Sequence, residues 1–372
     1  MPLYGKGEDD MKKVLAVVDT YYQLIIAMQL RLTIYRDDTF VLLMSDKSKN
    51  AEQVVKSINE QGLFSECHFI TNRDLIKKRT FIDRIEDLVQ LSFKKNNRYL
   101  YYLDDVKEKF FDELIIYNYN IDIIGLYVYL CETNPNLIIS FMEEGIYSYS
   151  FEILTNRGRS LIKMLRHLLN KKDATDVLEK FYCLNPELYC GTLKPVKIPP
   201  IESSSEISMV LKKIFHLDNV MNDYNKKYIF FSSVWDFEGG ESIGEYDIAC
   251  KVADIVGKEN ILVKIHPRDR RTIYADSGFA IDKNSEIPWE AIQLSADFSK
   301  KIFITTTSGS VMAGNFFTND KPRILYLYPL CSVDNNDGAK KNIENINKIL
   351  NNPKMHELLD NVVVVDNLRQ IL

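Results

Sequence analysis

The sequence lacks any apolar stretch of the roughly 18–20 residues that a helix needs to span a bilayer. It also lacks a secretory signal: the opening MPLYGKGEDD is polar and acidic, and we interpret residues 1–10 as a cloning remnant or disordered lead before Met11. A net charge of −5 leaves little basic surface, so we expect no nucleic acid as a partner. These absences favour a globular cytoplasmic protein.

Metal-binding and phosphate-binding patterns are missing too. None of the six cysteines forms a CxxC pair or a Cys/His cluster at zinc spacing, so we expect free, mostly buried thiols. There is no GxGxxG or GxxxxGK[ST] loop. Asp104 and Asp105 follow an apolar run, but surface acids explain them better than a metal site. We therefore predict neither a metal nor a cofactor.

Short β-rich apolar runs alternate with helical patterns along most of the chain, which predicts an α/β fold with parallel, doubly wound sheets. The predicted strands are 13–19, 39–44, 67–70, 98–103, 113–117 and 137–142 in the first half, and 227–232, 261–265, 301–305 and 323–328 in the second. Helices are predicted from residue 22, over 50–61, 241–256 and 342–350. A chain of 372 residues is too long for one core, so we expect two domains.

The alternation breaks in a stretch rich in proline and serine, GTLKPVKIPPIESSSE. This composition predicts a linker over residues 192–206. It divides the chain into a first domain over 11–191 and a second over 207–372.

Two adjacent acids follow the apolar run LIISFM. Glu143 and Glu144 precede Gly145, which permits a tight turn, and ligands of open α/β sheets bind beyond the carboxyl ends of strands. Neighbouring side chains on a strand point to opposite faces, so one acid could act as a general base, and we favour Glu144. The other would accept backbone N–H groups in the turn. The alternative is a solvated turn without chemistry.

A histidine follows the predicted strand 261–265. Pro267 fixes the backbone after His266, and the nearby arginines, Arg268 among them, supply positive charge for an anion. Such a histidine could donate a proton to a phosphate leaving group. The alternative is a structural histidine that closes a turn, with the arginines in solvent.

Hydroxyl side chains follow the predicted strand 301–305 and could bind an anion at the start of a helix, which they would also cap. This anion site would use Thr306, Thr307, Ser308 and Ser310. Ser232 and Ser233 end another strand and could touch a nucleotide. Glu290 could accept ribose hydroxyls beside a covering Trp289, with a capping carboxylate next to a core tryptophan as the alternative.

Residues 156–172 carry six lysines and arginines between apolar positions, and no acidic residue. The pattern predicts a basic amphipathic helix in a chain that is otherwise acidic. Its functional interpretation is a face for an anionic membrane or a lipid-linked acceptor. An ordinary surface helix is the alternative, which we favour slightly.

Three short motifs occur in a fixed order: EEG at 143–145, HP at 266–267 and TS at 307–308. In this order the chain resembles bacterial sialyltransferases. It is most similar to the lipooligosaccharide and capsule type, glycosyltransferase family 52, whose T-x-x-Q-L pattern would here begin at Thr20 and include Gln23. Bacterial polysialyltransferases share the three motifs.

The resemblance implies two Rossmann-like domains that face each other across a cleft, the GT-B type. It implies inverting, metal-independent transfer of sialic acid from CMP-sialic acid to a sugar hydroxyl, galactose in α-2,3 linkage, of a capsule or lipooligosaccharide glycan. Glu143 or Glu144 would be the base, His266 the acid, and the Ser/Thr stretch would hold the phosphate. Independently of the resemblance, we expect a cytoplasmic protein that could be peripheral at the inner face of the plasma membrane and could form a homodimer.

Other functions fit parts of the pattern. A polysialyltransferase would use the same donor. A UDP-sugar transferase or epimerase could share the two-domain fold, and a glycan-binding capsule-assembly protein could retain it without catalysis. The intact motifs argue against loss of catalysis.

Overall fold

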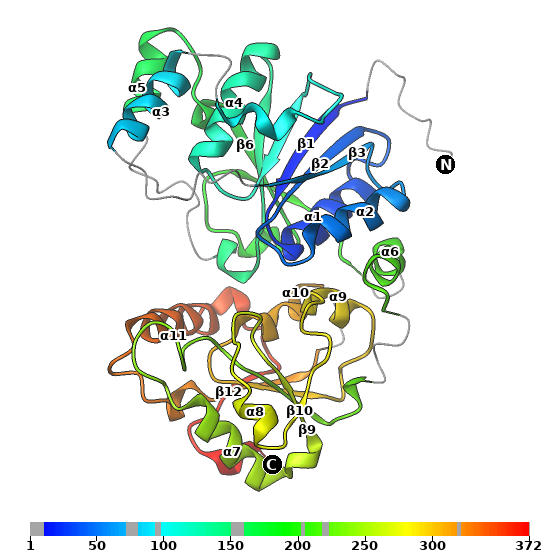
Figure 1. Cartoon of the computed structure of the whole chain (residues 1–372), viewed down its shortest axis with the longest axis vertical. Coiled ribbons are helices and arrows are strands. Elements are labelled where there is room, and N and C mark those ends of the chain that lie inside the picture. Colours follow the sequence, from blue (N-terminus) through cyan, green and yellow to red (C-terminus); the bar gives the residue numbers. More distant parts are fainter. Residues whose placement is uncertain are drawn as a thin grey trace. The chain divides into compact units, whose positions relative to one another are not determined.

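The computed structural model describes residues 11–71, 81–93, 98–149, 160–201, 205–217, 223–317 and 321–371. The chain divides into two compact units, Met1–Pro199 and Pro200–Leu372, and each is described by itself. Figure 1 shows that each unit is built around a sheet flanked by helices. Among the described residues, no helix has both the length and the apolar character required to cross a membrane.

The first unit contains a parallel sheet of seven strands in the order β3-β2-β1-β4-β5-β6-β7. The strands are β1 (Lys13–Val18), β2 (Thr39–Ser45), β3 (Glu66–Ile70), β4 (Glu113–Ile116), β5 (Ile138–Met142), β6 (Leu178–Cys183) and β7 (Lys194–Lys197). β1, β2, β4 and β5 are buried along nearly their whole lengths. Continuous apolar strands are expected where helices cover both faces of a parallel sheet.

The helices of the first unit are α1 (Tyr21–Leu32), α2 (Ala51–Glu60), α3 (Phe81–Phe93), α4 (Ile121–Thr133) and α5 (Ser160–Leu168). α1 follows β1 directly and packs on β1, β2 and β5. α4 links β4 to β5, and α3 packs against both α4 and α5. These connections place the residues that follow β1, β2, β4 and β5 together at one edge of the sheet.

The second unit repeats this plan with six parallel strands in the order β10-β9-β8-β11-β12-β13. They are β8 (Tyr228–Phe231), β9 (Ile261–Lys264), β10 (Ala280–Ile281), β11 (Ile302–Thr305), β12 (Arg323–Tyr326) and β13 (Val362–Val364). The helices are α6 (Glu206–Phe215), α7 (Glu245–Val256), α8 (Ile273–Asp276), α9 (Trp289–Leu294), α10 (Gly314–Phe317) and α11 (Asp337–Leu350). Both sheets therefore have the Rossmann strand order, as the sequence predicted for the fold class.

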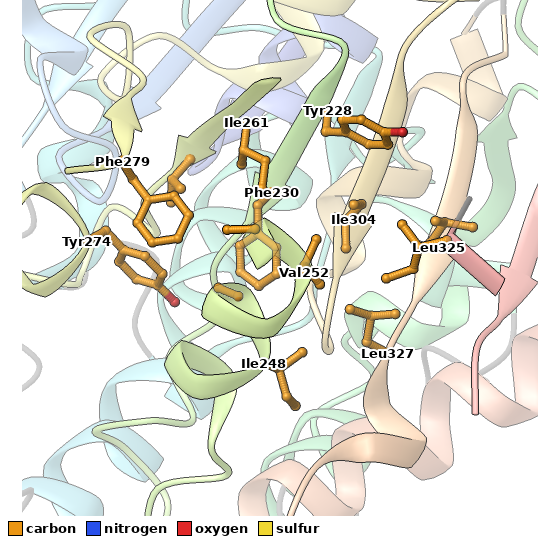
Figure 2. Close-up of a cluster of buried hydrophobic side chains, with 14 of the residues drawn as sticks. Tyr228, Phe230, Ile248, Val252, Ile261, Tyr274, Phe279, Ile304, Leu325 and Leu327 are labelled. Atoms are coloured by element: carbon orange, nitrogen blue, oxygen red, sulfur yellow. The ribbon is translucent and has the colours of Figure 1, made fainter. Parts of the chain in front are cut away.

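One face of the second sheet packs on α7. Figure 2 shows Ile248 and Val252 of α7 against Phe230, Ile261, Ile304 and Leu325 of the strands, with Tyr274 and Phe279 closing the cluster. All of these side chains are at least nine-tenths buried. The apolar layer fixes the start of α7 beneath the carboxyl ends of the strands, which matters for the site below.

One predicted strand was wrong. Residues 98–103 form a short 3-10 helix, η2 (Arg98–Leu103), and β4 takes the position beside β1 in the sheet. A short apolar run cannot reveal this difference by periodicity. The boundary between the two units, at Pro199 and Pro200, falls within the predicted linker 192–206, although the first part of that range forms β7, which pairs with β6. Residues 1–10 lie outside the described part of the chain.

Candidate functional site

The strand order of both sheets creates a switch point. In the first sheet it lies between β1 and β4, and in the second between β8 and β11, where the helical connections leave in opposite directions. Ligands of open α/β sheets bind beyond the carboxyl ends of the strands at such a point. Each unit therefore has one edge, formed by the carboxyl ends of its strands, at which polar side chains could bind a ligand. We call these the first edge and the second edge.

The first edge holds a charged cluster at its switch point. Asp19 follows β1, and its carboxylate accepts hydrogen bonds from Tyr117, which follows β4, and from the ammonium of Lys47, which follows β2. Asp19 and Tyr117 are buried, whereas the Lys47 side chain is 44% exposed. The ammonium is therefore held in place by a buried acid while it remains open to solvent, as a group that contacts a polar ligand would be.

The sequence reasoning missed this cluster. Asp19 and Tyr117 are the final residues of two predicted strands, 13–19 and 113–117, so the rule that ligands bind at strand ends could have identified them. Lys47 lies in an ordinary polar loop, SDKSKN, and no local pattern distinguishes it.

Thr20 and Gln23 close the start of α1. The Thr20 hydroxyl accepts the N–H of Gln23 at 3.3 Å, and the Gln23 carbonyl Oε1 accepts the N–H of Thr20 at 3.1 Å. This reciprocal pair is a capping box. Gln23 Oε1 also accepts the N–H of Asp19 at 2.7 Å. The Gln23 side chain is thus fixed from one end, and its Nε2 donates to Glu144 Oε2 at 3.3 Å.

Glu144 is the exposed member of the acidic pair. Its backbone N–H donates to the Ser148 hydroxyl at 2.9 Å, and the chain then turns at Gly145, whose φ of 122° favours glycine. Partial desolvation raises the pKa of the Glu144 carboxyl, and the nearby charge of Asp19 acts in the same direction, while the hydrogen bond from Gln23 opposes them. A carboxylate that is accessible and has a raised pKa is suited to accept a proton.

Glu143 is fully buried and has a different environment. Its carboxylate accepts hydrogen bonds from the hydroxyl of Tyr22 at 2.5 Å, from the hydroxyl of Tyr149, and from the N–H of Leu184 at 2.9 Å. Burial raises its pKa, and these three donors oppose the rise. The backbone N–H that it accepts comes from the segment after β6, not from the turn at Gly145 as predicted. With no exposed surface, Glu143 holds these three segments together and cannot reach a substrate.

His266 follows β9 at the second edge and is half-buried. Its Nδ1 accepts the N–H of Arg268 at 3.2 Å, so the neutral ring carries its proton on Nε2. Burial lowers the pKa of His266, and the Arg268 charge lowers it further. Pro267 and Arg268 are exposed, and the Arg268 guanidinium forms an ion pair with Glu238 at 2.8 Å.

Ser232 and Ser233 follow β8, and both are buried. The Ser232 hydroxyl accepts the N–H of His266 at 2.8 Å, which fixes the backbone of His266 to the neighbouring strand. The N–H of Ser233 donates to Glu245 Oε1 at 2.8 Å. These buried serines hydrogen-bond to other residues of the second edge. The sequence interpretation, in which they touch a nucleotide, is therefore not supported by their burial.

Glu245 connects the strands on either side of the second switch point. It opens α7 and is fully buried; Thr306, after β11, donates its hydroxyl to the second carboxylate oxygen. Burial raises the pKa of Glu245 to about 7. Sequence reasoning missed this residue, because nothing in GGESIGEYD separates it from the neighbouring acids.

The predicted anion site divides into inner and outer hydroxyls. Thr306 is buried on Glu245, and Thr307 is buried with its Oγ1 lacking a hydrogen-bond partner. Ser308 and Ser310 are half-buried, and their hydroxyls lie 2.8 Å apart. The prediction that Thr306 contacts the anion directly is therefore wrong, because its hydroxyl donates to Glu245 in the interior. Ser308 and Ser310 present the accessible hydroxyl pair.

Trp289 is a core residue. It is 3% exposed and packs edge-on against Phe231, Phe303 and Tyr224, so its proposed role as a cover for a base or sugar was wrong. Glu290 beside it is half-buried at the start of α9. Burial raises its pKa, whereas Lys264 lowers it. Contact of Glu290 with a ribose remains a prediction.

In the part of the chain that the structure describes, no cluster of His, Cys, Asp and Glu has the arrangement of a metal site. The described cysteines are free thiols, and Cys67 and Cys183 are buried. Of the predicted basic helix 156–172, the structure describes α5 and the residues that follow it. Arg166 there is buried and donates to the carbonyls of Leu91 and Lys172. The basic side chains of α5 therefore do not form a continuous exposed stripe.

No protein-family model matches the sequence. No curated protein matches it either. Among solved structures, UDP-GlcNAc 2-epimerase from Neisseria meningitidis bound to UDP-GlcNAc is similar at 13% identity and a TM-score of 0.43, over 96% of this chain and 98% of the other.

Two glycosyltransferase-type structures are similar to the same degree. LpCGTa in complex with UDP has 9% identity and a TM-score of 0.46, over 96% of this chain and 85% of its own. CalG4, the calicheamicin glycosyltransferase, has 7% identity and a TM-score of 0.43, over 96% and 87%. The solved structures similar to this chain therefore include both GT-B glycosyltransferases and UDP-GlcNAc 2-epimerases.

Proposed function

We propose that the chain is an inverting sialyltransferase that uses CMP-sialic acid as donor and the hydroxyl of a terminal sugar as acceptor. The donor nucleotide binds at the second edge. The hydroxyl pair of Ser308 and Ser310, in which one hydroxyl donates to the other, and the Nε2–H of His266 together supply two outward hydrogen-bond donors suited to one nucleoside monophosphate. This set of donors is the observation that carries the proposal.

The spacing of the strands supports one shared ligand for these donors. β9 and β11 both pair with β8, so His266 and Ser308 follow strands only two spacings apart, roughly 10 Å. A nucleoside monophosphate extends over a similar length. Thr305 fixes the loop from beneath by accepting the N–H of Ser308 at 2.9 Å and donating to the carbonyl of Phe231 at 2.9 Å.

The acceptor is activated at the first edge. Glu144 takes the proton of the acceptor hydroxyl, the acceptor oxygen forms a bond to the anomeric carbon of sialic acid, and the bond from that carbon to the CMP phosphate breaks. His266 stabilises the departing phosphate by hydrogen bonding or proton donation. The proton of the acceptor thus ends on Glu144, and the bonding pair leaves with CMP. The transition state has oxocarbenium character, which nearby carboxylates stabilise.

A UDP-sugar transferase or epimerase is the second candidate. The observation that favours it is the presence of two carboxylates, Asp19 and Glu144, close enough at the first edge for one charge to alter the pKa of the other. A pair of acids can remove a proton from a sugar carbon and return one to it. The two candidates differ in the nucleotide that they require.

Binding and turnover separate the candidates. Calorimetry of the full chain with CMP and with UDP should show preferential binding of CMP. The double variant Ser308→Ala/Ser310→Ala should weaken this binding by about tenfold or more, because the one outward hydrogen bond of the pair to a charged phosphate contributes roughly 1.5 kcal/mol. CMP release from CMP-sialic acid with a panel of galactosides then identifies the acceptor.

Preferential binding of UDP would replace the sialyltransferase with the second candidate. Binding of CMP without its release from CMP-sialic acid, with any acceptor, would contradict catalysis and favour a glycan-binding protein.

A further inference from the structure

Two neighbouring helices of the first unit expose large apolar side chains. The exposed residues are Phe81, Ile82, Ile85 and Val89 on α3, and Leu161, Met164, Leu168 and Leu169 on α5 and just after it. We call these eight residues the apolar face. They make up eight of the 13 exposed large hydrophobic residues found among the described residues, so exposure of this kind is concentrated on two elements.

The spacing of the exposed residues shows that the face belongs to folded helices. On α5, Leu161, Met164 and Leu168 are three and four residues apart and share one side of the helix, while Ile162 and Arg166 are buried on another. α3 repeats the pattern with Ile82, Ile85 and Val89.

The two helices pack against each other, as Figure 1 shows. Arg166 fixes α5 to α3 by donating to the carbonyl of Leu91 at 3.1 Å. The same guanidinium lies over the ring of Tyr127 on α4, at 5.9 Å from its centre. The apolar side chains are therefore presented by a rigid support.

Positive charge accompanies the apolar face. The sequence over 156–172 contains six lysines and arginines and no acid, in a chain of net charge −5. Among the described residues, Lys163 and Lys171 are 41% and 31% exposed beside their partners Asp176 and Glu132, and Lys172 is exposed. α3 carries the opposing charges Asp83, Glu86 and Asp87, of which Asp87 is buried and Glu86 accepts a hydrogen bond from Gln90 at 2.7 Å.

We propose that α3 and α5 dock this protein on an anionic membrane surface. Amphipathic helices with lysine and arginine near an apolar side lie in the headgroup region, where the apolar residues insert and the cations meet lipid phosphates. A second copy of the chain is the less favourable occupant, because it would bring two basic segments together. The inference does not depend on the donor sugar.

Vesicle sedimentation of the full chain tests the proposal. The probes are phosphatidylcholine vesicles with and without phosphatidylglycerol. The triple variant Leu161→Gln, Met164→Gln and Leu168→Gln removes the face of α5 at exposed positions with a residue that favours helices. Met209→Gln is the matched control, since Met209 is 57% exposed on α6 of the second unit.

The wild-type chain should sediment with the phosphatidylglycerol vesicles and less with the neutral ones, and added salt should weaken binding. The triple variant should bind at least about tenfold more weakly, while Met209→Gln should bind like the wild type. Equal sedimentation of the triple variant, or no sedimentation of the wild type, would overturn the proposal. A dimer in analytical ultracentrifugation that only the triple variant dissociates would assign the face to a second copy instead.

Discussion

The side chain of Gln23 joins the start of α1 to the carboxylate of Glu144. Its Oε1 accepts the N–H groups of Asp19 and Thr20, and its Nε2 donates to Glu144 at 3.3 Å. The helix cap therefore fixes the amide, and the amide orients the candidate base. The glutamine of the T-x-x-Q pattern therefore caps its own helix and also binds Glu144, which lies 121 residues away in the sequence.

The two acids of the EEG motif should not be interchangeable. Glu144→Gln removes the accessible base, so we expect kcat to fall by about 10²–10⁴-fold with unchanged stability. Glu143→Gln disturbs a buried carboxylate with three hydrogen-bond donors, so the free energy of unfolding should fall by roughly 1–3 kcal/mol. Urea denaturation and steady-state kinetics on both variants measure the two effects. Near-normal kcat in Glu144→Gln would remove the base from the mechanism.

Substitutions of Gln23 and Asp19 should shift the pH profile in opposite directions. A general base must be deprotonated, so kcat/KM is lost as the pH falls through the pKa of Glu144. Gln23→Leu removes a hydrogen bond that lowers this pKa, and the acidic limb should move to higher pH. Asp19→Asn removes a charge that raises it, and the limb should move to lower pH.

The profile of kcat/KM against pH for the three proteins measures these shifts. Circular dichroism is the control for folding, because Gln23→Leu also removes the Gln23 half of the capping box, while the Thr20 cap is retained. Identical limbs in both variants would show that another group titrates.

Charges around His266 should tune the basic limb of the same profile. If the imidazolium acts as acid, kcat/KM falls as the pH rises through the pKa of His266, which burial and Arg268 hold below the usual range. Arg268→Ala should raise this pKa and move the limb to higher pH. Glu238→Gln removes a charge that raises the pKa and should move it to lower pH. An NMR titration of the imidazole provides the direct measurement.

His266→Ala tests whether the side chain takes part at all. Loss of the acid should lower kcat by about 10²–10⁴-fold, with KM for the donor affected less. Wild-type kcat in this variant would exclude His266 from the reaction.

The sequence predicted the two parallel sheets because their strands are apolar along most of their length and the patterns between them are helical. It did not reveal β6, β7, β10 or β13. β6 has Glu179 and Lys180 within it, β7 carries Pro195 and two lysines, and β10 and β13 contain two and three residues. These strands lie toward the edges of their sheets, where burial and hence the apolar signal is weaker.

The candidate site was predictable where a residue lies within three residues of the end of a strong apolar strand, as Glu144, His266 and Ser308 do. Sequence alone could not tell an accessible side chain from a buried one at adjacent positions. The choice between Ser308 and Thr306 depends on Glu245, which comes from a different element and fixes the threonine hydroxyl in the interior. The covering role of Trp289 was wrong and the alternative of a core tryptophan was right, because the surrounding aromatic rings come from distant segments.

The buried carboxyl of Glu245 should make the stability of the second unit depend on pH. Its pKa rises from an ordinary value of 4.5 to about 7 on folding, because the carboxylate is buried. The folded state therefore binds the proton more tightly than the unfolded state does. This preference stabilises the fold below about pH 4.5, and the contribution is lost as the pH rises through about 7.

Glu245→Gln keeps the shape of the side chain but cannot ionise. The free energy of unfolding of the wild type, relative to this variant, should therefore fall by roughly 3 kcal/mol between these two pH values. Both tryptophans, Trp235 and Trp289, lie in the second unit, so urea denaturation followed by their fluorescence reports on this unit alone. Thr306→Val removes a hydrogen bond that lowers the pKa of Glu245, so the pKa should rise further in this variant. The pH-dependent fall in the free energy of unfolding should therefore continue to a higher pH than in the wild type. If the free energy of unfolding had the same pH dependence in the wild type and in Glu245→Gln, folding would not shift the pKa of Glu245. The link that Glu245 makes between Ser233 and Thr306 would then not depend on pH.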